Sequence, residues 1–140
     1  MTESQIFAVE QSFAKVRPIA HVAADLFYAR LFDTAPSVRA MFPDDMAEQK
    51  RKLMAMLGAV VGMLRTPQTL IPAVEQLGKR HVNYGTRPEH FGAVGAALLW
   101  TLEQGLGNDY TPEVADAWTT AFGVIAERMT AMLPNQEVAS

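Results

Sequence analysis

The chain has 140 residues, of which 49% are hydrophobic and 19% charged, so it can fold as one globular domain around one core. Twelve basic and fifteen acidic side chains give a formal net charge of -3, which excludes the broadly basic surface that nucleic acids and anionic membranes attract. The absence of cysteine excludes disulfides, thiolate metal sites and a cysteine nucleophile.

The N-terminal residues carry neither the basic residues nor the apolar run of a secretion signal. No stretch approaches the roughly 18 uninterrupted apolar residues that a membrane-spanning helix needs. We therefore expect a cytoplasmic protein without a membrane or nucleic-acid partner.

The first half of the chain predicts four helical segments. A capping-box pattern begins at Thr2, and Pro18 suits the first turn of the second helix. A short helical piece, residues 37–42, lies between two prolines, and Asp44 or Asp45 can cap the long helix that follows. The long helix has the strongest amphipathic pattern in the chain, at Leu53, Met56, Leu57, Val60, Val61 and Leu64.

The second half continues the helical pattern. A shorter helix places three apolar residues and a histidine on one face, at Leu70, Val74, Leu77 and His81. Two more helices follow Pro88 and Thr111. No segment alternates with period two, so the predicted fold class is all-α, with about seven helices. We expect one domain over residues 1–133 and a short polar tail over residues 134–140.

His81 stands on the inward face of its predicted helix, one turn after Leu77. One interpretation is a core histidine whose ring is satisfied by a carbonyl group, since a buried imidazole needs only one or two partners. The alternative is a ligand for a metal or a haem iron, with the second ring nitrogen donating to a carbonyl. The residue alone does not decide between them.

Gln49 and Tyr28 also have two interpretations. Gln49 lies four residues before Leu53 and shares the apolar face of the long helix, but it stands where that face runs out towards solvent. Tyr28 can be a core residue whose hydroxyl reaches water. Either side chain can instead point into a dry pocket and donate a hydrogen bond to a bound ligand.

Three further residues are ambiguous in the same way. Phe42 is typical of a core anchor. Lys52 and Arg80 are typical of a solvated helix face, yet each lies next to an inward residue and could reach a carboxylate at the mouth of a pocket. Other chemistry finds little support, because the histidines lack zinc-binding spacing and there is no nucleophile elbow, phosphate-binding loop or dinucleotide fingerprint.

Taken together, these segments resemble bacterial single-domain globins and the globin domains of flavohaemoglobins, and they are also similar to neuroglobin. The resemblance covers roughly residues 2–133. The matching stretches are the second helix at 26–32, the segment 37–42, the distal helix at 49–53, the proximal helix at 77–85 and the last two helices from 90 to 123.

The resemblance implies a haem b whose iron is held by His81. Without cysteine, the haem has no covalent attachment to the chain. Tyr28 and Gln49 become distal hydrogen-bond donors to a diatomic gas such as O2, NO or CO, and Lys52 and Arg80 become partners of the haem propionates. The residues that the resemblance places around the haem are Phe42, Lys52, Leu53, Leu57, Leu77, Arg80, Tyr84, Phe91 and Val94.

Two departures from the family pattern affect the expected chemistry. Gln49 occupies the place of the distal histidine of neuroglobin, which argues against permanent coordination of the iron by two histidines. Phe91 and Leu133 stand where flavohaemoglobin-type globins brace the proximal imidazole with a tyrosine and a glutamate. Without that brace, gas binding is favoured over peroxidase-like reactivity.

We therefore predict reversible oxygen binding with slow oxygen dissociation, and oxidation of nitric oxide to nitrate as a further activity that needs an external reductase. Oxygen transport is one physiological role of such binding. The alternatives are a gas sensor that acts through a partner protein and a haem-free interaction module with a globin fold. The expected assembly is a monomer or a homodimer.

Overall fold

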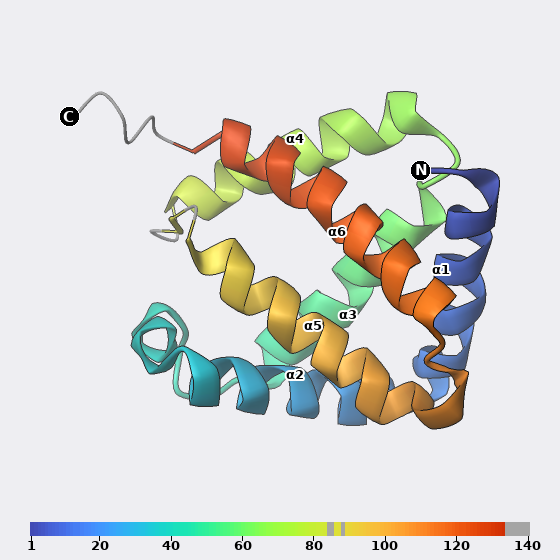
Figure 1. Ribbon diagram of the computed structural model, residues 1–140. Helices are drawn as coiled ribbons and strands as arrows, with labels where there is room; N and C mark the ends of the chain where they lie inside the picture. Colours follow the sequence, from blue (N-terminus) through green and yellow to red (C-terminus); the bar gives the residue numbers. More distant parts are fainter. Residues whose placement is uncertain (84–85, 88, 134–140) are drawn as a thin grey trace.

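The computed structural model describes residues 1–83, 86–87 and 89–133, and over these residues the regular structure is helical (Figure 1). The α-helices are α1 (Glu3–Val16), α2 (Ala20–Thr34), α3 (Ala47–Gly62), α4 (Pro67–Asn83), α5 (His90–Leu106) and α6 (Pro112–Ala131). Short 3-10 helices join them at η1 (Arg17–Ile19), η2 (Pro36–Met41) and η3 (Gly107–Asp109). The predicted all-α fold is confirmed. In this part of the chain no helix is both long and apolar enough to cross a membrane.

Two helix starts follow the predicted capping chemistry. The side chain of Thr2 accepts a hydrogen bond from the backbone N–H of Gln5, and the Gln5 side chain accepts one from the backbone of Thr2. The capping box of α1 is therefore confirmed. Ahead of α6, the Thr111 hydroxyl accepts from the N–H of Val114 at 3.3 Å, as expected of an N-cap.

Two other helix starts differ in detail from the prediction. Pro18 lies in η1 rather than in the first turn of α2, because the chain turns through a tight 3-10 segment before α2 begins at Ala20. The N-cap position of α3 is Met46, but the carboxylate of Asp45 still accepts the N–H of Ala47 at 3.0 Å. Asp45 therefore accepts a hydrogen bond from the first turn of α3, although it lies one residue before the N-cap position.

The core forms where α1, α2, α5 and α6 pack on one another. Inside it, the indole N–H of Trp118 on α6 donates to the hydroxyl of Ser12 on α1 at 2.8 Å, and Ser12 donates in turn to the carbonyl oxygen of Ala8. Every buried side-chain polar atom of the described residues has such a partner. Between α1 and α6 the core is therefore closed, and its buried polar groups are hydrogen-bonded.

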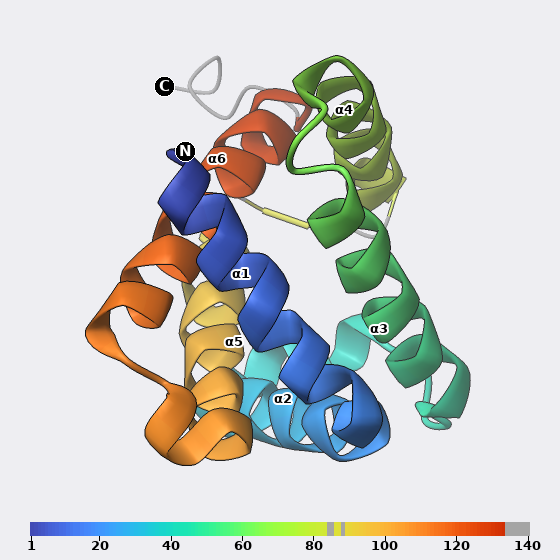
Figure 2. The same ribbon diagram turned by 90° about the vertical axis from the view of Figure 1, so that its right-hand side faces the viewer.

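The helices α3 and α4 are held by different neighbours. In both views α2 and α4 lie at opposite ends of the molecule, and α3 runs between these ends (Figures 1 and 2). Helix α3 packs on α2 and α1, whereas α4 packs on α6. Gln49 on α3 and His81 on α4 therefore belong to two helices that do not form a tight pair with each other.

Candidate functional site

Helices α2 and α3 bring Tyr28 and Gln49 together. The amide Nε2–H of Gln49 donates to the phenol oxygen of Tyr28 at 3.2 Å. Tyr28 is only 4% exposed, so its hydroxyl does not reach bulk water. Because the phenol oxygen accepts from Gln49, the phenol hydrogen is directed elsewhere.

Burial also changes the acidity of Tyr28. Loss of solvation raises the pKa of the phenol above its ordinary value of about 10, and the hydrogen bond from Gln49 offsets part of the rise. The phenol therefore keeps its proton throughout the physiological pH range. Tyr28 is a neutral hydrogen-bond donor in an apolar environment.

An aromatic cluster holds the Tyr28 ring in place. The ring centroid of Tyr28 lies 5.8 Å from that of Phe32 and 5.6 Å from that of Phe42. Arg39 stacks over Phe32 at 5.0 Å and donates to the carbonyl oxygen of Phe42 at 3.3 Å. These contacts fix the segment after η2 against α2. The sequence prediction missed Phe32 and Arg39, although Phe32 follows Tyr28 at the helical spacing of four.

His81 lies near the end of α4 and is half-buried. Its Nδ1 atom is 2.7 Å from the carbonyl oxygen of Leu77. A carbonyl oxygen can only accept, so Nδ1 carries the hydrogen, and in the neutral imidazole the lone pair is on Nε2. This tautomer is the one in which Nε2 can bind a metal ion. The predicted residue Tyr84 lies outside the described residues.

The apolar residues predicted around the haem are half-buried and pack against the core. They are more exposed than the side chains of the main core, such as Val9 and Leu31, which are only 1% and 2% exposed. The partly exposed apolar surface suits a flat hydrophobic group, since covering it contributes about 25 cal/mol per Å². These residues are Phe42, Leu53, Leu57, Leu77, Phe91 and Val94.

Lys52 and Arg80 are exposed. Among the described residues, every lysine and arginine except Lys52, Lys79 and Arg80 forms at least one ion pair or stacks on an aromatic ring. For these three, no ion pair, hydrogen bond or ring contact is found. Lys52 directly precedes Leu53 on α3, and Arg80 directly precedes His81 on α4. Two cations on the two helices are thus available to a ligand that carries carboxylates. The residues present therefore fit a haem in both apolar surface and charge.

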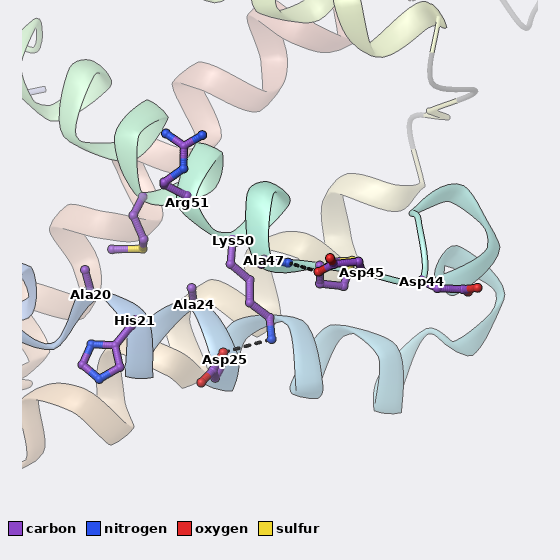
Figure 3. Close-up of a pocket in the computed structure, with 11 residues that line it drawn as sticks. Ala20, His21, Ala24, Asp25, Asp44, Asp45, Ala47, Lys50 and Arg51 are labelled. Atoms are coloured by element: carbon purple, nitrogen blue, oxygen red, sulfur yellow. Dashed lines mark hydrogen bonds and ion pairs between the residues drawn. The ribbon is translucent and has the colours of Figure 1, made fainter.

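A cleft of about 720 Å³ lies between α2 and the start of α3, apart from these residues (Figure 3). Its charged side chains are largely neutralised within the chain: Lys50 Nζ lies 2.9 Å from the carboxylate of Asp25, and Arg51 pairs with Glu48. Asp45 is occupied in capping α3. None of the residues predicted for the site lines this cleft, so it is not the candidate site.

The structure groups most of the predicted residues by element. Tyr28, Gln49 and Phe42 meet where α2, η2 and α3 converge. Leu53 and Leu57 of α3 line a small internal cavity of about 20 Å³. The remaining described residues lie on α3 (Lys52), on α4 (Leu77, Arg80 and His81) and near the start of α5 (Phe91 and Val94).

Comparisons with known proteins identify the family of the chain. Residues 25–129 match the family model of the globins. A flavohemoprotein of Rhodopirellula baltica is 31% identical over 130 residues, which is 91% of this chain and 32% of the relative. A flavohemoprotein of Bacillus subtilis is 35% identical over 104 residues, which is 72% of this chain and 26% of the relative. The chain thus spans a third or less of the length of these relatives.

Solved structures show the same fold. An engineered carbene transferase and candidate nitric oxide dioxygenase from Rhodothermus marinus has a TM-score of 0.83 and 22% identity, and the match covers 94% of this chain and 92% of that one. A bacterial globin from Campylobacter jejuni has a TM-score of 0.81 and 23% identity, with 94% and 95% covered. Together with the family match and the helical arrangement of the site, these findings show that the chain belongs to the globin family.

Proposed function

We propose that this globin binds haem b without a covalent bond and uses it to bind oxygen and other diatomic gases reversibly. The observation that carries the proposal is the hydrogen bond from His81 Nδ1 to the carbonyl oxygen of Leu77, because it selects the tautomer with the hydrogen on Nδ1 and the lone pair on Nε2. The bond also restrains the orientation of the imidazole on α4. His81 is thus the residue proposed to hold the iron.

Other residues are proposed to hold the haem in place. The half-buried apolar side chains of α3, α4 and α5 would cover its faces, and Phe42 would pack against its edge. Lys52 and Arg80 would pair with its propionates, which adds charge-assisted hydrogen bonds at the surface. When bound, the haem would supply an iron atom able to bind a diatomic gas.

Tyr28 and Gln49 are the proposed donors to the bound gas. The Gln49 amide donates to the phenol oxygen of Tyr28, which leaves the phenol hydrogen to point at another acceptor. A gas that gains electron density on binding offers such an acceptor. In a dry pocket the bond is stronger than it is in water, so oxygen should dissociate slowly.

We also propose that the protein can oxidise nitric oxide. Nitric oxide and oxygen combine to nitrate when one electron is supplied, and the proposed source of this electron is a reductase on another chain. The description of the Rhodothermus neighbour as a candidate nitric oxide dioxygenase supports this class of reaction. In this reaction Tyr28 and Gln49 would hold the oxygen while nitric oxide enters.

The proposal also includes a globin domain over residues 1–133 with a short tail over 134–140, a cytoplasmic location, and a monomeric or homodimeric state. Of these features, oxygen binding depends only on the intact domain.

Absorption spectra of the purified protein test the binding proposal. After titration with one equivalent of haemin, the ferric, ferrous and carbonyl forms should each give a sharp Soret band at a distinct wavelength. A spectrum that stays that of free haemin at every ratio would contradict the proposal. The dioxygenase proposal is tested separately, by mixing the oxygenated protein with nitric oxide in a stopped-flow instrument and measuring the nitrate formed, with an equal amount of free haemin as the reference.

A further inference from the structure

Gly78 of α4 lies in close contact with Met129 and Met132, at the end of α6. A methyl group at this position would stand 3.0 Å from the Cα atom and 3.1 Å from the carbonyl oxygen of Met129, and 3.0 Å from the Cβ atom of Met132. Carbon atoms in ordinary contact are about 3.5–4.0 Å apart. Two of the three neighbouring atoms belong to the backbone, so a side-chain rotation cannot make room for the methyl group.

The same seam carries the main attachment of α4 to the rest of the protein. Among the described elements, α6 is the one on which α4 packs broadly. One turn before Gly78, the carboxylate of Glu75 pairs with Arg128 of α6 at 3.6 Å. The position of α4 is therefore set by its contact with α6 rather than by α3 or α5.

His81 is coupled directly to this turn of α4. Its Nδ1–H is bonded to the carbonyl oxygen of Leu77, the residue that immediately precedes Gly78. A displacement of the Gly78 turn would therefore carry the bonded imidazole with it. Relief of the crowding that a methyl group causes needs a shift of a few tenths of an ångström.

We propose that Gly78 is a positioning residue, which lets α4 lie on the backbone of α6 and so sets the position of the His81 imidazole relative to the iron. This inference rests on the proposed function, because it concerns the bond between His81 and the haem iron. Gly78 touches neither haem nor gas. Its effect is transmitted through the helix.

The test compares Gly78→Ala with Gly123→Ala in the haem-loaded protein. Gly123 lies in the interior of α6, is exposed and has open space around its Cα, so this variant changes a helical glycine without crowding. Resonance Raman spectra of the ferrous form measure the stretching frequency of the iron–histidine bond. The band should shift in Gly78→Ala, and the oxygen dissociation rate should change several-fold. Both quantities should stay at wild-type values in Gly123→Ala.

A double variant keeps the test valid if Gly78→Ala alone does not fold. Met132→Gly removes one of the three crowding contacts and leaves the two with the backbone of Met129. Gly78→Ala combined with Met132→Gly should therefore be less destabilised than Gly78→Ala and carry a smaller shift, measured against Met132→Gly alone. An iron–histidine band that is identical to its reference in both comparisons overturns the positioning role. Wild-type protein that lacks the band altogether overturns the proposed function, and the positioning role with it.

Discussion

Two hydrogen bonds between single residues bear on the alternatives that the sequence left open. Tyr28 is buried and accepts from Gln49, so neither side chain ends in bulk solvent. The ring nitrogen of His81 is satisfied by a carbonyl oxygen, as the core interpretation required, but this bond is equally the one that a metal ligand needs. At this scale, the carbonyl bond is compatible with the ligand role and fixes the tautomer that this role needs.

Replacement of Tyr28 by phenylalanine should speed oxygen dissociation. The variant removes one hydrogen bond in a dry pocket, which is worth about 1.5–3 kcal/mol when an acceptor carries charge, or roughly a tenfold to hundredfold change in rate. Stopped-flow displacement of oxygen by carbon monoxide measures the rate. Tyr110→Phe is the matched control, since Tyr110 follows η3 outside the site. Equal dissociation rates in wild type and Tyr28→Phe would refute the distal-donor role.

The raised pKa of Tyr28 predicts a pH dependence of stability. In the unfolded chain the phenol loses its proton near pH 10, whereas burial keeps the proton on the folded protein to higher pH. Between these two pKa values the unfolded state binds fewer protons, so the free energy of unfolding falls as pH rises. Urea titrations from about pH 9 to about pH 11 should show a steeper loss in wild type than in Tyr28→Phe. Parallel losses in the two proteins would exclude this origin.

At the scale of helices, much of the pattern was accessible from the sequence. The capping residues Thr2 and Thr111 and the apolar faces predicted the helices because they act locally. The close contact at Gly78 could not be predicted, since it depends on which helix lies across it. The spacing of four residues between Tyr28 and Phe32 could be read from the sequence, but their aromatic cluster could not. The cluster also needs Phe42, whose position depends on how the preceding segment folds back on α2.

The link between α1 and α6 gives a prediction for stability. Trp118→Phe removes the donor to Ser12 and part of a buried ring, which should lower the free energy of unfolding by about 1–3 kcal/mol. Urea unfolding followed by circular dichroism measures it. Trp100→Phe serves as control, because Trp100 is half-buried beneath Arg30 and should lose less. A larger loss in the control would show that the link contributes little.

For the whole molecule, the all-α architecture and the order of the site residues along the chain were predictable, whereas the pairing of helices was not. Periodicity shows which face of a helix is buried but not what covers it. The packing of α3 on α2 and of α4 on α6 is a property of the assembled chain. It places Gln49 and His81 on helices with separate supports, which is the arrangement that a flat group held between them requires.

Exchange of His81 for alanine tests this account most directly. Wild-type protein, His81→Ala and His21→Ala are each titrated with haemin and reduced under carbon monoxide; His21 is exposed on α2, apart from the site. We predict that His81→Ala loses the carbonyl Soret band of the wild type, that added imidazole restores it, and that His21→Ala keeps it. An unaltered carbonyl spectrum in His81→Ala would contradict the assignment of His81 as the iron ligand.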